Sequence, residues 1–338
     1  PPYMEETDSD STRMPPIYDK FMEASYKVGD KVELITPARF LFNAGYTPKK
    51  WNEKMLSDEH FQVLYYEPNA TNIFPNTDIK GGVAITYHDI TTEYEPIRIF
   101  SKYPEQNQIL RKVSNMHPAS FTELVYPALS YKATKVMTLE NRQLLEKQKS
   151  KSNPDPKELR FRTSAFNVLE EIFFENKPSD GKEYIRIIGL KDSKRTYRWV
   201  DKRYISCPDN FEYYKVIMPK SNGSGQISDV ISSPLVGNPG LGHTQTFISI
   251  GKFNSELEAN NCLKYIKTKF ARVMLSVKKI TQDNPPETWR FVPQQDFSQS
   301  SDINWNGSIH EIDMQLYAKY KLTDKEIQFV EDNVKEME

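Results

Sequence analysis

Cysteine and histidine are scarce in this 338-residue chain. It contains two cysteines, Cys207 and Cys262, and five histidines that form neither an HxH nor an HExxH pattern. Two cysteines cannot build a disulfide framework or a cysteine-ligated zinc site, and scattered histidines do not indicate a histidine-ligated metal. The sequence therefore predicts no metal centre.

Long apolar runs are also missing. No stretch approaches the roughly 18–20 apolar residues that span a membrane, and no signal peptide is recognisable. Hydrophobic residues nevertheless make up 38% of the sequence and aromatic residues 12%. This is enough apolar material for packed cores and excludes global disorder. We therefore expect a folded chain of about two domains with no membrane partner.

A strong net charge is absent as well. The formal net charge is −1, which taken whole argues against nucleic-acid binding. The charge is uneven, however: residues 1–100 carry 10 basic and 16 acidic side chains, whereas residues 127–205 carry 18 basic and 11 acidic ones. Residues 252–297 are again basic (8 against 5), and residues 298–338 are acidic (4 against 9). A basic middle is a candidate for phosphate contact, although an ordinary solvated surface produces the same pattern.

Hydrophobic periodicity predicts alternating helices and strands in the first hundred residues. Helices are expected over 17–28 and 47–57, the second with Thr47 as N-cap and Pro48 at its first position. Strands are expected over 32–35, 61–66 and 82–87. This alternation predicts part of a layered α/β sheet.

The remaining two thirds are expected to mix helices with short strands. The patterns predict a connecting helix at 104–116, an amphipathic helix at 159–174, a β-rich module at 183–217 and tail helices at 308–320 and 323–337. Residues 255–282 predict one long helix that begins with a Ser255/Glu258 capping box. Its apolar face lies opposite a basic face made of Lys264, Lys267, Lys269, Arg272, Lys278 and Lys279.

Three short motifs follow one another in the first eighty residues. Pro1-Pro2-Tyr3 opens the chain, Thr36-Pro37 follows the expected strand of 32–35, and Phe74-Pro75 precedes the strand of 82–87. This order resembles the C-terminal half of the catalytic domain of adenine-N6 DNA methyltransferases from restriction–modification systems, the TaqI-like class. In that family an Asn-Pro-Pro-Tyr motif ends a central strand. The loop at 220–225 and the stretch at 265–293 resemble the family's target-recognition region, so the resemblance covers nearly the whole chain.

The resemblance implies a fold and a division of the chain. The implied fold is α/β: the C-terminal part of a Rossmann-like methyltransferase sheet, followed by an α+β target-recognition region and a helical tail. On this basis residues 1–103 are expected to be the second half of the catalytic domain and 104–117 a connector helix. Residues 118–297 are expected to recognise DNA, and 298–338 to form the acidic helical tail.

The implied reaction is methyl transfer from S-adenosylmethionine to the N6 amine of a specific adenine in double-stranded DNA. Pro1, Pro2 and Tyr3 are the implied catalytic residues, because in the family the motif's asparagine side chain and the carbonyl of its first proline accept hydrogen bonds from that amine. Tyr3 and Phe74 are implied to stack on a base flipped out of the duplex. The asparagine would precede residue 1, and the family's glycine-rich cofactor turn has no counterpart here. We therefore expect that a missing N-terminal half binds S-adenosylmethionine, and that this fragment alone is inactive.

DNA contact is expected from the 220–225 loop and from the basic helix face. The residues concerned are Lys220, Asn222, Lys264, Lys267, Lys269, Arg272, Lys278 and Lys279. A plain flexible loop and a solvated helix face are the alternatives. A second pattern, Asp180 with Asp192-Ser193-Lys194, loosely resembles a nuclease metal signature but arises easily in lysine-rich sequence.

Two other functions stay open at this stage. The parent protein could join an endonuclease domain to the methyltransferase, or the chain could be a non-enzymatic DNA-binding module. A cognate restriction endonuclease is a further expected partner, and the prokaryotic cytoplasm is the expected location.

Overall fold

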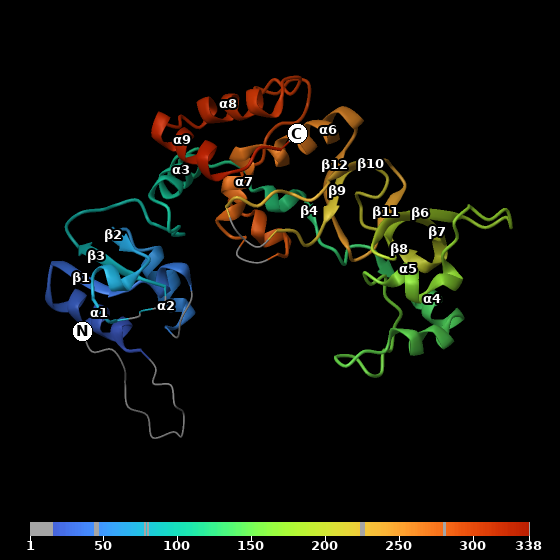
Figure 1. Cartoon of the computed structure of the whole chain (residues 1–338), viewed down its shortest axis with the longest axis horizontal. Helices are drawn as coiled ribbons and strands as arrows, with labels where there is room; N and C mark the ends of the chain where they lie inside the picture. Colours follow the sequence, from blue (N-terminus) through green and yellow to red (C-terminus); the bar gives the residue numbers. More distant parts are fainter. Residues whose placement is uncertain are drawn as a thin grey trace. The chain divides into compact units, whose positions relative to one another are not determined.

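The computed structural model describes residues 16–43, 47–77, 79, 81–223, 227–279 and 282–337. It is a mixed α/β structure with several small sheets (Figure 1). The chain divides into two compact units, Pro1–Asn107 and Gln108–Glu338. The boundary falls inside α3 (Pro104–Asn115), the helix expected at 104–116. No helix of the described residues is long and apolar enough to cross a membrane.

The first unit is built on a three-stranded sheet. Its strands are β1 (Lys31–Pro37), β2 (Phe61–Glu67) and β3 (Val83–Asp89), in the order β1-β3-β2. The three strands expected from the sequence are thus confirmed. Because β3 runs antiparallel to both neighbours, β1 and β2 are parallel and end at the same end of the sheet. Among the described strands, only β3 pairs with β1.

Two helices accompany this sheet and are also confirmed. α1 spans Tyr18–Val28 and α2 spans Lys49–Leu56. The expected N-cap was one residue early, since Pro48 takes that position and the Thr47 hydroxyl instead donates to Asn52 Oδ1 at 2.7 Å.

The two faces of the sheet differ in burial. Residues of α1 and α2 share a hydrophobic core with alternate strand residues such as Leu34 and Ala84. Side chains alternate between the faces of a sheet, so Ile35, Ile85 and Tyr65, which are aligned by the strand register, lie on the opposite face. There Ile35 is 42% and Tyr65 49% exposed. One face of the sheet is therefore packed and the other is an open apolar surface.

The described residues of the second unit form three sheets. The first has the order β10-β9-β12-β4 and the second β11-β6-β7; the third pairs β5 with β8. The strand bounds are β4 Val125–Tyr126, β5 Lys132–Ala133, β6 Tyr184–Lys191, β7 Lys194–Asp201, β8 Ile205–Ser206, β9 Tyr214–Pro219, β10 Leu235–Gly237, β11 Leu241–His243 and β12 Phe247–Phe253. The β-rich segment at 183–217 is confirmed, but its strands are divided among all three sheets.

Two expectations for helices in this unit were wrong. The segment 159–174 contains only the short α5 (Ala165–Val168), while α4 spans Lys135–Glu140. The backbone N–H groups of Leu159 and Arg160 bond to side chains of Thr138 (3.1 Å) and Gln148 (2.9 Å), not within a helix. Long-range hydrogen bonds therefore override the helical periodicity.

The long helix expected at 255–282 is two helices, α6 (Glu256–Lys267) and α7 (Lys269–Ser276). Thr268 separates them with an extended ψ of 149°, and its hydroxyl accepts from Ala271 N at 3.1 Å as the N-cap of α7. The same hydroxyl donates to Tyr265 O at 2.7 Å. A threonine that bonds the backbone on both sides makes a helix end where the apolar pattern continues.

The capping box at Ser255 and Glu258 is confirmed, and so are the two tail helices. α8 spans Ile309–Lys319 and α9 spans Asp324–Asn333, and each begins with a capping box of its own. Asp313 of α8 accepts hydrogen bonds from Lys269 N (2.9 Å) and Phe270 N (2.8 Å). The tail thereby satisfies the exposed amides that begin α7.

Candidate nucleic-acid interface

Of the residues expected to form a base pocket, the structure describes Phe74. Pro1, Pro2 and Tyr3 lie outside the described residues. Phe74 follows a short 3-10 helix at Ala70–Asn72 and begins a tight turn in which Thr77 N–H donates to Phe74 O at 3.1 Å. Asn76 has a positive φ of 68°, so with Pro75 before it this is a type II turn. The Phe74 side chain is 36% exposed.

The strand register brings the Thr36-Pro37 and Phe74-Pro75 motifs to one end of the sheet. Pro37 ends β1, Glu67 ends β2, and both are aligned with Val83 at the start of β3. Gly82 has a φ of +76°, and a Cβ on it would lie 2.2 Å from Glu67 O, so only glycine fits there. Gly82 O also accepts from Ala38 N at 3.0 Å. Phe74 thus extends from a fixed end of the sheet, where its ring can stack on a planar group.

Three of the expected DNA contacts lie inside the second unit. Arg272 is 3% exposed, Lys279 5% and Asn222 7%. Arg272 donates to backbone carbonyls such as Lys267 O (3.1 Å), and Lys279 Nζ donates to Asn222 O (2.6 Å). Burial lowers the pKa of Arg272 to about 10 and also lowers the pKa of Lys279. The partners of both cations are groups of the chain itself.

Most of the other expected contacts are also bound within the fold. Lys264 Nζ donates to Trp305 O at 2.7 Å, and Lys269 pairs with Glu331 at 2.6 Å. Lys278 pairs with Glu287, and Lys267 is half-buried at the last position of α6. The basic face of 255–282 is therefore largely used to hold the tail and the loops around it.

Lys220 differs from these residues. Its backbone is fixed between Thr246 O (2.9 Å) and Asn284 N (2.7 Å). Its half-buried side chain makes no hydrogen bond or ion pair with any residue that the structure describes. Its ammonium group is therefore available for an external anion.

The basic segment 127–205 holds most of its positive charge on its surface. Eight of its 18 basic residues form ion pairs with carboxylates. Among the described residues, the exposed cations without such a partner are Lys132, Lys135, Arg142, Lys151, Arg160, Lys177, Arg186, Lys194 and Arg195. The charge of the segment identified this region as a candidate for phosphate contact. Which of its cations lack a carboxylate partner depends on the fold.

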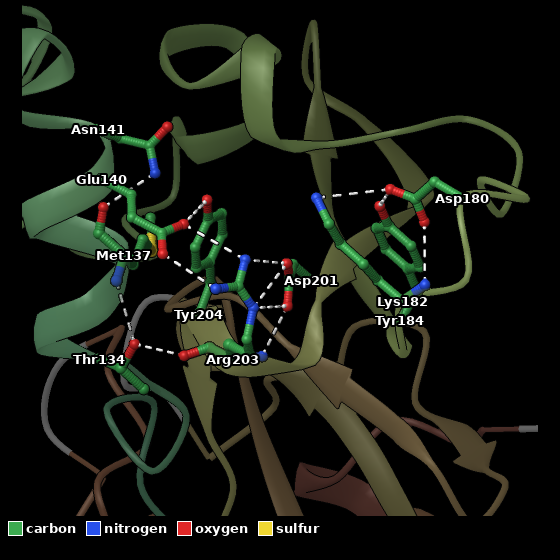
Figure 2. Close-up of polar contacts among 10 residues, drawn as sticks. All are labelled: Thr134, Met137, Glu140, Asn141, Asp180, Lys182, Tyr184, Asp201, Arg203 and Tyr204. Carbon is green, nitrogen blue, oxygen red and sulfur yellow. Dashed lines mark hydrogen bonds and ion pairs between the residues drawn. The ribbon is translucent and has the colours of Figure 1, made fainter.

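Polar networks occupy the carboxylates of this segment (Figure 2). The Arg203 guanidinium lies between Glu140 (2.9 Å) and Asp201 (2.8 Å), and Tyr204 donates to Glu140 at 2.7 Å. Hydrogen bonds from Tyr204 and Arg203 lower the pKa of Glu140. These carboxylates are therefore charged at neutral pH, and they fasten α4 to the turn after β7 rather than forming an acid–base pair.

The loose nuclease signature is not assembled. Asp180 accepts from the Tyr184 hydroxyl (2.8 Å) and pairs with Lys182 (Figure 2). Asp192 lies in the turn beyond β6. An eight-residue strand separates the two carboxylates, which is about 25 Å of extended chain. No group of three or more His, Cys, Asp or Glu side chains suited to a metal occurs within the described residues.

Two comparisons with known proteins found a similarity, one in sequence and one in structure. Residues 1–74 match the sequence model of the Eco57I restriction-modification methylases. No curated protein matches the chain. Among solved structures, the type IIG restriction endonuclease BpuSI is similar over 95% of this chain and 48% of that one, with 10% sequence identity and a TM-score of 0.35. The chain thus spans about half the length of that enzyme.

Proposed function

We propose that this chain is part of a site-specific DNA adenine-N6 methyltransferase of a restriction–modification system. The observation that carries the proposal is the match of residues 1–74 to a restriction-modification methylase family. The first unit would complete the catalytic sheet and the adenine pocket, and the second would recognise double-stranded DNA. Such an enzyme acts on DNA in the prokaryotic cytoplasm.

The sheet of the first unit supports this proposal. One edge of β1 is without a partner strand among the described residues, and the face with Ile35 and Tyr65 is open and apolar. An unpaired edge and an uncovered apolar face are features of a sheet that is completed by further elements. We propose that a Rossmann-like methyltransferase sheet continues beyond β1 and that the continuing part binds S-adenosylmethionine. When bound, this cofactor supplies an electrophilic methyl group.

The proposed role of Phe74 follows from its position. A target adenine must leave the base stack, which costs a few kcal/mol. Stacking on an aromatic ring returns about 1–3 kcal/mol per base. Phe74 is a partly exposed ring held by a turn at the end of the sheet, which suits this task, and Tyr3 would stack on the opposite side of the base. The carbonyl of Pro1 would accept a hydrogen bond from the adenine amine and make its nitrogen more nucleophilic, with Pro2 holding the motif rigid.

The test is methyl transfer by the parent protein that contains this chain. Tritiated S-adenosylmethionine and duplex DNA are supplied, and the position of the label is determined by nucleoside analysis. We expect label on N6 of adenine. Incorporation into cytosine would contradict the adenine assignment, and no incorporation with any duplex would contradict the proposed function. Adding Mg²⁺ to the same assay shows whether the parent also cleaves DNA.

Phe74→Ala tests the pocket. Losing one stacking contact predicts a turnover reduced by roughly 5- to 100-fold, with duplex affinity changed by less than about threefold. Phe74→Tyr keeps the stacking surface and should retain most turnover. The control is Leu64→Ala, which removes an apolar side chain of β2 that is 53% exposed. An equal loss of turnover and duplex affinity in Phe74→Ala would contradict a stacking role.

A further inference from the structure

One end of the sheet formed by β6 and β7 exposes a row of aromatic and cationic side chains. Arg186 on β6 is aligned with Trp199 on β7, and Trp199 is in turn bridged to Phe174, whose backbone N–H donates to Trp199 O at 2.9 Å. Directly aligned residues share a face of the sheet, so the three side chains lie side by side. Phe174 is 37% exposed. We call Phe174, Lys177, Tyr184, Arg186 and Trp199 the cation–aromatic row.

The opposite face explains why these side chains point outward. Ile185, Ile187 and Val200 alternate with the row along the same strands and are buried in the core of this module. Phe173, next to Phe174, is buried in that core too. Strand alternation therefore puts the row on the opposite face. Farther along that face, Ile188 is buried against Ile217 and Phe247, so the row occupies its exposed end. The side chain of Tyr184 packs edge-on against Phe174, with ring centroids 5.7 Å apart.

The two cations of the row are held by aromatic rings, not by carboxylates. The Arg186 guanidinium lies 4.3 Å from the centre of the Tyr197 ring, and Lys177 Nζ lies 5.6 Å from the centre of the Trp199 ring. Neither forms an ion pair with a described residue. Cation–aromatic contacts at exposed sites are worth only about 0.5–1 kcal/mol, so both cations can turn toward an external anion at small cost.

The carboxylates around the row are already neutralised by other cations. Glu175 pairs with Arg198 (2.7 Å), Glu183 with Lys202 (2.8 Å), and Asp201 with Arg203 (2.8 Å). Asp180 pairs with Lys182 and accepts from the Tyr184 hydroxyl (Figure 2). The surface therefore presents uncompensated positive charge beside exposed rings.

From this juxtaposition we propose that the cation–aromatic row binds unpaired nucleotides of a single DNA strand, with Trp199 and Phe174 stacking on bases and Arg186 and Lys177 contacting phosphates. Stacking platforms combined with positive charge bind single-stranded nucleic acid because every base has a π-face. Strands lie about 4.8 Å apart, so three aligned positions span roughly 10 Å. A sheet surface of this size accommodates two or three bases.

Duplex DNA and a protein partner fit the row less well. Bases in a duplex are stacked on one another and offer only their edges and the backbone, so Trp199 and Phe174 would find no flat partner. An acidic peptide would use the cations but leave the rings unused. The combination of both groups in one row is what favours unpaired nucleotides, and this reasoning does not depend on the methyltransferase proposal.

In the experiment, the full chain is titrated with an octamer of deoxythymidine, and binding is monitored by tryptophan fluorescence. Trp199 is half-buried, whereas Trp51, Trp289 and Trp305 are at most 7% exposed, so stacking on Trp199 is expected to dominate the quenching. We expect Trp199→Ala to weaken binding to the octamer more than binding to a blunt duplex of equal length, because duplex bases offer no free face to the row. Trp199→Ala should weaken binding roughly 5- to 100-fold. Trp199→Phe should abolish quenching but keep the affinity, measured by anisotropy, within about threefold.

Salt dependence tests the cations separately. Each phosphate contact on a single strand contributes about −0.7 to the slope of log affinity against log salt. Arg186→Gln should therefore reduce the slope by that amount while leaving quenching intact. Lys151→Gln removes an exposed cation of the same basic segment that lies outside the row, and it should change neither octamer affinity nor quenching.

Three results would overturn the proposal. They are equal weakening of octamer and duplex binding by Trp199→Ala, normal octamer binding by Trp199→Ala, and equal weakening of octamer binding by Lys151→Gln and Arg186→Gln. Thermal unfolding of each variant shows that it is folded; if Trp199→Ala does not fold, Trp199→Phe and Arg186→Gln carry the test. If the parent protein methylates DNA but Trp199→Ala binds the octamer normally, only the proposal about the row is wrong.

Discussion

His243 makes the stability of the second unit depend on pH. The ring is 0% exposed on β11, with Nδ1 3.0 Å from Thr244 O and Nε2 3.3 Å from Ser249 Oγ. Because a carbonyl only accepts, Nδ1 carries the proton and Nε2 accepts from the serine hydroxyl. Burial lowers the pKa of His243 to about 4, so the folded unit keeps this histidine neutral where the unfolded chain protonates it.

The shifted pKa of His243 determines how the free energy of unfolding depends on pH. Histidine in the unfolded chain has a pKa of about 6.5, so between pH 6.5 and the lower pKa of the folded state the unfolded chain binds more protons. Stability therefore falls as the pH falls through this range. At pH 5 the free energy of unfolding is lower than at pH 8 by about 2 kcal/mol. Well below pH 4 the loss reaches its limit of about 3.4 kcal/mol, which is the pKa difference multiplied by 1.36 kcal/mol per unit. The measurement is urea unfolding of the chain at pH 8, 7, 6 and 5.

His243→Asn is the matched variant, because it keeps a side-chain N–H donor and does not titrate. It should be less stable than the native chain at pH 8 but should lose about 2 kcal/mol less between pH 8 and 5. Other titrating groups, such as Asp313, whose pKa burial raises to about 6, affect both proteins equally and cancel in the comparison. Identical pH dependence in the two proteins would refute the reasoning.

Two backbone positions give further predictions. Gly82→Ala places a Cβ 2.2 Å from Glu67 O at a φ of +76°. This change should lower the free energy of unfolding by about 2–4 kcal/mol. Gly181→Ala has a similar φ of +81° but open space and should cost only about 1–2 kcal/mol; equal costs in urea titrations would contradict a steric origin. Thr268→Val removes the N-cap of α7 and should cost about 1–2 kcal/mol, whereas Thr268→Ser should be near neutral in thermal unfolding; an equal loss in both would refute the capping role.

The sequence predicted the first unit better than the second. Its strands are apolar runs bounded by turn residues such as Gly81-Gly82 and Thr36-Pro37, and local patterns of this kind specify strands without help from distant contacts. The capping boxes at Ser255 and in the tail helices are local for the same reason. The break at Thr268 escaped prediction because the apolar spacing continues through it, and only the hydroxyl's hydrogen bonds end one helix and begin the next.

The expected DNA contacts show that the exposure of charged residues is difficult to predict from the sequence. A basic side chain on a helical pattern is normally assigned to the solvent side, yet Arg272 of α7 lies against a carbonyl at the end of α6 and another in the tail. Lys215 is 0% exposed and donates to three backbone carbonyls of residues 210–213. Such burial is stable because backbone carbonyls accept from the buried cations. The carbonyls come from the preceding turn for Lys215 and partly from the tail for Arg272, and neither the turn geometry nor the position of the tail can be read from the spacing of charged residues. Conversely, the alignment of Trp199 with Arg186 depends on a strand register that composition alone does not provide.

One edge of β1 has no partner among the described strands, and this affects how the chain behaves at high concentration. A strand with unpaired N–H and C=O groups is a template for another extended segment, and charged residues protect only the Lys31–Glu33 end of it. The stretch from Leu34 to Thr36 carries no charge, and the adjoining face shows Ile35 and Tyr65 to solvent. When this unit is produced by itself at high concentration, strand exchange between copies competes with correct assembly. A designer who wished to handle the unit alone would place a lysine at Ile35, which would protect the edge and make the open face less apolar.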